Sequence, residues 1–209
     1  MSLDLIDPSR PDPWVPGIPF REMVVSVLYP AREVGGHPRE PYFTPIVARA
    51  YEQQIGVPVP LSWPITHARR HAPVLRREGG WPVVLYAPGL GDERNDTTAI
   101  AEDLASHGYV VVTIDFVHDS GVVELPDGPL AESAVPEPTL PVTIKEVVSR
   151  ILGEPASWVT ALIGTINGPR AVTVERTYIK AWFDTYLGHH DNRLLAGPSP
   201  LFPEVEFVR

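Results

Sequence analysis

The chain has 209 residues, 44% of them hydrophobic, which is enough for one sizeable core, and a single domain over residues 1–209 is expected. A net charge of −9 without clusters of Lys and Arg argues against nucleic acid and anionic membranes as partners. The lack of cysteine excludes disulfides, thiolate catalysis and Cys-based metal sites. There is no apolar run of ~18 residues and no signal-like N-terminus, which predicts a cytoplasmic protein without a membrane span; a secreted protein whose signal had been removed would look the same.

The first quarter of the chain predicts an extended segment, a strand and a helix. Five prolines within residues 1–22 remove backbone donors and favour extended structure, so this segment should run over the surface. The β-branched residues of Met23–Tyr29 predict a strand, and Pro30 ends it. Apolar residues at helical spacing predict a helix over Ile46–Ile55.

The next segment, Val57–Arg77, carries four prolines and is expected to be a solvated loop. His67 and His71 lie four residues apart and could share the face of a helix, which is one spacing for metal ligands. No third ligand is evident, and the two arginines between the histidines oppose cation binding. The interpretation as a solvated loop is therefore preferred.

The most informative stretch is Trp81–Asp115, which predicts a strand, a Gly-rich turn, a helix and a second strand. The strands are the apolar runs Pro82–Ala87 and Tyr109–Ile114, and Gly108 is placed to end the helix between them. Both runs are continuously apolar rather than alternating. This pattern predicts strands buried on both faces of a mostly parallel sheet.

This stretch resembles the beginning of an α/β-hydrolase. Within that fold it is most similar to the platelet-activating-factor acetylhydrolase and actinobacterial lipase group, which carries a similar P-V-V-L-Y-x-x-G-L-G-x-x-R-N followed by A-E-D-L-A-S-H-G-Y-V-V-V-T-I-D. The resemblance implies that the backbone N–H of Leu90, beside Gly91, forms half of an oxyanion hole. From the residues alone, a tight turn that binds nothing is an equal alternative, because a single G-x-G is weak evidence.

His118 and Asp119 follow the second strand directly, at the edge of the sheet where α/β proteins bind ligands. The resemblance implies that this segment shapes the site without supplying its acid or base. A catalytic role for His118 is a weak hypothesis, because no nucleophile is visibly paired with it. The residues from Val122 to Leu130 predict a hairpin that turns at Asp127-Gly128.

The C-terminal third predicts mainly helices. Thr143 and Glu146 form a capping box before an amphipathic helix that stops at Gly153. Ser157–Ile166 is apolar and fits either a strand or a helix. A further helix is expected from Pro169 to Gly188, followed by an extended tail. From Gly164 onward the sequence again resembles the end of the same hydrolase group.

The catalytic centre of that group has no counterpart in this sequence. No G-x-S-x-G elbow occurs, and neither a catalytic acid nor a catalytic histidine can be placed; His189 and His190 fit a solvated turn after the last helix. The chain thus divides into a family-like part over 23–119, a connector and helix over 120–150, and a family-like part over 151–209. We expect an internally shortened α/β-hydrolase-like sheet, flanked by helices, that exposes an apolar edge; a homodimer is one way to bury that edge.

Three functions remain open. The first is that of a carboxylic-ester hydrolase that takes a small acyl ester or similar apolar ligand, with no cofactor or metal and with little or no Ser-His-Asp chemistry in this chain. The second is a catalytically silent binding protein that keeps the oxyanion loop. The third is a lyase or cyclase that uses His118 or Asp119 as acid or base, for which no supporting constellation is visible.

Overall fold

The computed structural model describes residues 2–56, 60–126, 128–135, 168–188 and 190–207. The chain falls into two compact units, Met1–Glu154 and Pro155–Arg209, and each is described by itself. The prediction of a single domain stays a prediction. The helix expected to end at Gly153 and the apolar Ser157–Ile166 segment lie outside the described residues.

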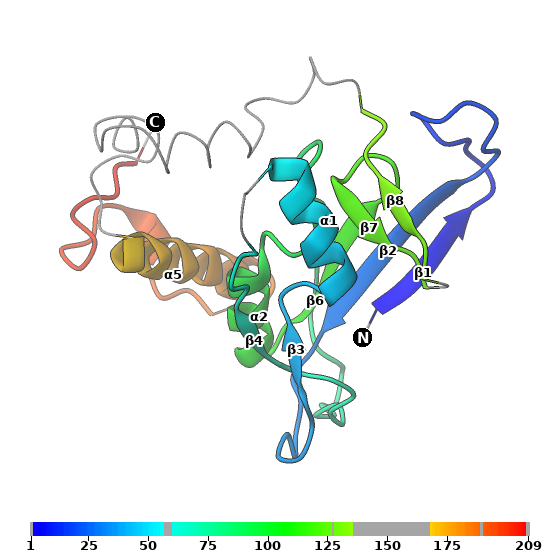
Figure 1. The fold of residues 1–209 in the computed structure, drawn as a ribbon. Coiled ribbons are helices and arrows are strands. Elements are labelled where there is room, and N and C mark those ends of the chain that lie inside the picture. Colours follow the sequence, from blue (N-terminus) through cyan, green and yellow to red (C-terminus); the bar gives the residue numbers. More distant parts are fainter. Residues whose placement is uncertain (1, 57–59, 127, 136–167, 189, 208–209) are drawn as a thin grey trace. The chain divides into compact units, whose positions relative to one another are not determined.

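The first unit is built on a four-stranded sheet. Its strands, in spatial order, are β1 (Ser2–Asp7), β2 (Arg21–Leu28), β6 (Val110–Phe116) and β5 (Val83–Tyr86) (Figure 1). Strands β1, β2 and β6 pair antiparallel, whereas β5 and β6 pair parallel. The α/β class is confirmed, but the described sheet is mixed rather than mostly parallel. The difference arises partly because the N-terminal segment, expected only to cross the surface, begins with β1 before its first proline.

The burial of the parallel pair differs from the expectation for strands covered on both faces. Strand β6 alternates between buried and half-buried residues, and in β5 the side chains of Val83 and Leu85 are 56% and 71% exposed. Val83 and Leu85 are two residues apart and project from the same face of the sheet, so that face of β5 is exposed; β5 is also an edge strand within the described part of the sheet. In the described part of the sheet β5 is thus an apolar edge strand, and the internal shortening of the sheet stays a prediction. A homodimer across it stays a prediction.

Two helices of the first unit form where the sequence predicts them. Helix α1 (Pro45–Ile55) begins with Thr44, whose hydroxyl accepts a hydrogen bond from Val47 N–H, and ends at Gly56 in the left-handed conformation. Helix α2 (Thr98–Ser106) buries its apolar face against β6. Helix α1 runs alongside β7, as Figure 1 shows.

Two small antiparallel ribbons complete this unit. They are β3 (Arg39–Pro41) with β4 (Ile65–Arg69), and β7 (Val122–Glu124) with β8 (Leu130–Glu132). The hairpin predicted from Val122 is confirmed. The expected solvated loop is wrong at β4, whose pairing with β3 was not visible in the local sequence. His67 lies on this strand and His71 in a turn with φ of 56°, so the two do not share a helix face.

An aromatic cluster joins α1 to β7. Phe43, Val47, Tyr51 and Val122 are buried together, with Trp63 packed against them. The ring of Phe43 meets that of Trp63 edge to face, with centroids 4.7 Å apart, and Trp63 Nε1 donates to Glu52 Oε1 at 2.8 Å.

The second unit contains α5 (Gly168–Tyr186) and a short 3₁₀ helix, η2 (Leu194–Ala196). The helix predicted from Pro169 is confirmed, and η2 lies between it and the tail over 197–209, which was expected to be extended. In that tail Ser199 and Phe202 form an isolated antiparallel bridge, so the chain turns there. Arg170 forms an ion pair with Glu204 and lies over the ring of Phe202, so it ties the tail to α5. Among the helices that the structure describes, none has the length and apolar character needed to cross a membrane.

Gly108 and Gly36 offer a matched test of packing behind α2. Both have positive φ, 94° and 86°, but a Cβ at Gly108 would lie 2.8 Å from the Trp81 ring, whereas one at Gly36 would meet nothing within 4 Å. Gly36→Ala should lower the free energy of unfolding by ~1 kcal/mol through backbone strain alone. Gly108→Ala should lower the free energy of unfolding by a further ~1–3 kcal/mol, because the added Cβ overpacks against the Trp81 ring. Urea denaturation of both variants measures the difference, and equal losses would contradict it.

Candidate functional site

In the Gly-rich loop after β5, some backbone donors have partners within the described residues and Leu90 N–H has none there. Asp92 N–H donates to Gly89 O at 3.1 Å, and Gly91 N–H donates to Asp119 Oδ1 at 3.4 Å. Among the described residues, Leu90 N–H donates to nothing, and Leu90 is 40% exposed. Of the two oxyanion candidates, Gly91 N–H is thus engaged inside the protein, whereas Leu90 N–H has no partner among the described residues. The oxyanion role itself stays a prediction.

Asp119 joins the segment that follows β6 to the Gly-rich loop that follows β5. Its Oδ1 accepts the Gly91 N–H, and its Oδ2 accepts from Trp14 Nε1 at 3.3 Å. Gly121 N–H also donates to Gly91 O at 3.2 Å. The segment after β6 therefore holds the Gly-rich loop, and Asp119 acts on it as a hydrogen-bond acceptor. The sequence placed both segments at the same edge of the sheet but gave no signal for Trp14.

His118 is held by a buried carboxylate from the N-terminal segment. Its Nδ1 lies 2.8 Å from Asp12 Oδ2, and its backbone adopts a φ of 65°, which is uncommon outside glycine. Asp12 Oδ1 accepts N–H bonds from Trp14 and Val15. Burial raises the pKa of Asp12, but the hydrogen bonds from His118, Val15 and Trp14 outweigh it and leave that pKa below its usual value.

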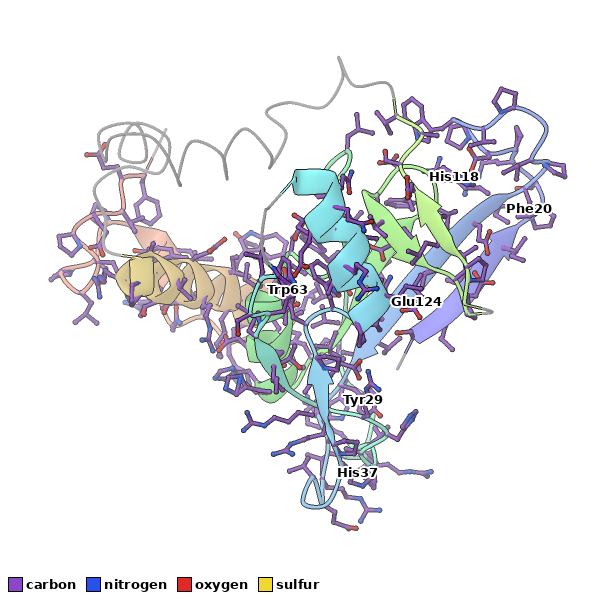
Figure 2. The ribbon with its side chains drawn as sticks, viewed as in Figure 1. Phe20, Tyr29, His37, Trp63, His118 and Glu124 are labelled. Carbon is purple, nitrogen blue, oxygen red and sulfur yellow. The ribbon has the colours of Figure 1, made fainter. Side chains whose placement is uncertain are left out.

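The contact between His118 and Asp12 joins residues 106 positions apart, so the sequence could not reveal it. Figure 2 shows His118 at the Phe20 end of β2, whereas Tyr29 lies at the other end. Because β6 runs antiparallel to β2, the Phe20 end is also where β6 finishes. His118 therefore stands at the edge of the sheet that carries the Gly-rich loop.

One serine in the described part of the chain contacts an imidazole, and it does not form a catalytic pair. Ser106 Oγ lies 3.2 Å from His107 Nδ1, but Asp103 O lies 2.7 Å from the same nitrogen. In a Ser-His-acid triad the serine and the acid contact opposite nitrogens of the ring. This arrangement, at the far end of α2, is a helix C-terminal contact and cannot relay a proton from the serine.

A buried ion pair fixes the residues that follow the loop. The Arg94 guanidinium pairs with Asp115 Oδ2, and Arg94 N–H donates to Asp115 Oδ1 at 2.6 Å. Arg94 Nε also donates to Ser26 Oγ at 3.0 Å. Burial raises the pKa of Asp115, and the adjacent guanidinium opposes that shift. The pair attaches the start of α2 to β6 and β2.

Glu93 is a buried carboxyl without a cationic partner among the described residues. It is 3% exposed, and its Oε1 accepts the Val122 N–H at 3.2 Å. Burial, followed by the charges of Asp96 and Asp115, raises its pKa to about 8. A Cβ on Gly121 would lie 2.6 Å from Glu93 Oε1, so a larger residue at 121 would displace this carboxyl. The sequence gave no signal for Glu93, because its neighbours in space are distant in the chain.

Comparisons with known proteins support the resemblance seen in the sequence. Residues 61–126 match the family model of platelet-activating factor acetylhydrolase, isoform II. A probable 1-alkyl-2-acetylglycerophosphocholine esterase of Arthroderma benhamiae is 39% identical over 49 residues, which are 23% of this chain and 13% of that protein. This chain therefore matches only a small part of that relative's length.

A solved structure extends the likeness to the fold of the whole chain. The ferulic acid esterase of Streptomyces cinnamoneus superposes with a TM-score of 0.75 and 22% sequence identity, covering 100% of this chain and 95% of that one. At this identity the likeness establishes the fold. The family-matched segment contains Leu90, Gly91, His118 and Asp119, so the predicted site residues lie where the relationship is detected in sequence.

Glu93 predicts an unusual pH dependence of stability. Its pKa is about 8 in the folded protein and near 4.5 ordinarily, so between these values the folded state holds one proton more than the unfolded state. Stability should therefore fall as pH rises from 4.5 to 8, by up to ~1.4 kcal/mol per pH unit. Glu93→Gln should flatten this fall relative to the wild type, and Glu78→Gln, on an exposed turn, should not. Urea denaturation across this range measures both; parallel curves for the wild type and Glu93→Gln would refute the assignment.

Removing one partner of the buried ion pair should be costly. Asp115→Asn leaves the Arg94 guanidinium buried without its counter-charge and should lower the free energy of unfolding by ~3–5 kcal/mol. The matched control is Asp92→Asn, which removes a carboxylate from the same loop at an exposed position. A loss within ~0.5 kcal/mol is expected for the control. Denaturation of both variants at pH 6.5 tests this, and equal losses would show that the pair does not anchor the loop.

Proposed function

We propose that this chain, which is related to the platelet-activating-factor acetylhydrolase and esterase group of the α/β-hydrolases, binds carboxylic esters at the loop between β5 and α2. The carbonyl oxygen of the ester accepts a hydrogen bond from Leu90 N–H. The observation that carries this proposal is the Leu90 N–H at the carboxyl end of β5, which has no partner among the described residues, in a loop fixed by Asp119 and Gly121.

The geometry of the loop suits a carbonyl oxygen that gains negative charge. A fixed backbone N–H needs no reorganisation when an oxyanion forms, so it stabilises the tetrahedral state more than the planar ester. A free donor beside an engaged one also restricts where the oxygen can sit. The names of the relatives, an alkylacetylglycerophosphocholine esterase and a ferulic acid esterase, have the ester bond in common. A small acyl ester is therefore the substrate class we propose.

The chemistry we propose for this chain is limited. The residues that the structure describes place no serine against a histidine in the arrangement of a triad, and His118 uses one ring nitrogen on Asp12. Without a triad, an oxyanion donor and substrate binding alone give only ~10³–10⁴ over the uncatalysed reaction. We therefore propose a protein of hydrolase type with little or no Ser-His-Asp turnover.

The presence of an activated serine can be tested directly. The purified 209-residue chain, shown to be folded by circular dichroism, is treated with a fluorophosphonate probe and read by intact mass, beside hydrolysis of p-nitrophenyl acetate. We expect no stoichiometric adduct and turnover no more than ~10⁴ above the uncatalysed rate. One adduct that heat denaturation abolishes would overturn the triad-free proposal, and peptide mapping would identify the nucleophile.

Ester recognition by Leu90 needs a test that does not require turnover. A phosphonate monoester, such as the methyl ester of benzylphosphonic acid, carries the tetrahedral anion that an oxyanion donor should bind. Leu90→Pro removes the N–H, whereas Leu90→Ala keeps it and shortens the side chain. Calorimetry should show Leu90→Pro binding about tenfold more weakly than Leu90→Ala, the value of one charge-assisted hydrogen bond. Equal affinities in two folded variants would exclude the Leu90 donor.

A further inference from the structure

The first unit contains a cavity, partly open to solvent, that Leu90 does not line. Its volume is about 420 Å³, which is within the range of small-molecule sites. It lies over the face of the sheet that carries Thr113 and Asp115, beneath α2, the β3–β4 ribbon and the start of α1. Leu90 is not among its lining residues, and His67, whose side chain is 85% exposed, lines the cavity where it meets solvent.

The cavity carries more negative than positive charge. Its lining includes five carboxyl side chains and three arginines. Each arginine already has an acceptor: Arg70 binds Glu40 through two bonds of 2.7 Å, Arg94 pairs with Asp115, and Arg69 donates to His37 O. The three arginines that line the cavity are therefore each bound to an acceptor of the protein itself.

Two of the carboxyl groups have no cation beside them within the described residues. One oxygen of Glu93, Oε1, accepts the Val122 N–H, and its other oxygen has no hydrogen-bond partner among the described residues. Glu124 accepts the Thr44 hydroxyl. Glu124 lies two residues beyond Val122 on β7, and Val122 N–H is the group that binds Glu93, so both carboxyl groups reach the cavity near β7. Figure 2 shows Glu124 beside the first turn of α1.

Aromatic rings form the adjoining wall. Tyr42 and Phe43 line the cavity, and their rings lie edge to face with centroids 4.7 Å apart. The negative face of an aromatic ring attracts an organic cation, and this attraction is strongest where water is excluded. A cavity with unpaired carboxyl groups and an aromatic wall favours a cation that also has apolar surface.

We propose that this cavity is a second ligand site, which binds a small alkyl- or arylammonium ion between Glu93 and the ring of Phe43. The site does not depend on the ester proposal, because its residues and its ligand chemistry are different. A metal ion is less suitable, since no group of three or more candidate ligands occurs in the described part of the chain. The partner is therefore an amine with an apolar body that fills the aromatic end.

Binding of such an ion should be linked to the proton on Glu93. That carboxyl, with a pKa of about 8, is mostly neutral at pH 6.5 and must lose its proton to oppose the cation. Affinity for a cation whose charge does not titrate should therefore rise between pH 6.5 and 8.5. The charged and titratable groups around Glu93 are the acids Asp92, Asp96, Asp115 and Glu124, the base Arg94, and the phenols of Tyr42 and Tyr51.

The test uses benzyltrimethylammonium as the cation and 2-phenylethanol as a neutral molecule of similar shape. Calorimetry on the full chain at pH 6.5 and 8.5 should show cation binding that strengthens about tenfold with pH, whereas 2-phenylethanol binding changes little. Glu93→Gln should weaken cation binding about tenfold at pH 8.5 and remove its pH dependence. Glu78→Gln makes the same change in net charge outside the cavity and should match the wild type.

Three results would overturn the proposal: no binding of the cation at pH 8.5, equal binding of the cation and 2-phenylethanol, or equal weakening by Glu93→Gln and Glu78→Gln. Glu124→Gln provides a second variant, which should also bind the cation more weakly than the wild type does. Circular dichroism checks that this variant is folded. Leu90→Pro separates this site from the ester site, because it should leave cation binding unchanged. Loss of cation binding in Leu90→Pro would contradict a separate cavity.

Discussion

The buried ion pair between Arg94 and Asp115 is the interaction on which the rest of the site depends. Asp115 lies on β6 with almost no exposure, and a carboxylate there is tolerated because a guanidinium reaches it from the loop after β5. Arg94 also binds Ser26, so three segments meet at one side chain. The start of α2 and the end of the Gly-rich loop therefore have little freedom to move relative to the sheet.

Leu90 N–H has no partner among the described residues, and the contacts on either side of it give the reason. On one side of Leu90 the chain leaves β5, and on the other Gly91 is bound through its N–H to Asp119 and through its carbonyl to Gly121 N–H. With both flanks attached, the peptide between them cannot turn inward to satisfy its donor. A backbone N–H at the carboxyl end of a strand, without a partner among the described residues, is a suitable binding group for an oxygen ligand.

Local sequence predicted β2, β5, α1, α2, β6 and α5, because their periodicity and end signals are contained in each segment. It did not predict β4, since a five-residue strand in a proline-rich segment is defined by its partner β3 rather than by its own pattern. The contacts of the site likewise depend on partners that are distant in the sequence. Asp12 with His118, and Glu93 with Val122, join residues that only the folded chain brings together, so the sequence gave the Gly-rich loop but neither of these pairs.

The unpaired acid Glu93 is the feature that the structural role of the loop does not explain. Arg94, its neighbour in sequence, is bound to Asp115, so the fold uses its nearest positive charge elsewhere. Burying a carboxyl without a cation costs free energy, and the protein reduces this cost by keeping the proton. A residue that served packing alone would be stable as an apolar side chain or an amide. A carboxyl that opens onto a cavity and can exchange its proton for an external cation accounts for both its burial and its lack of a partner.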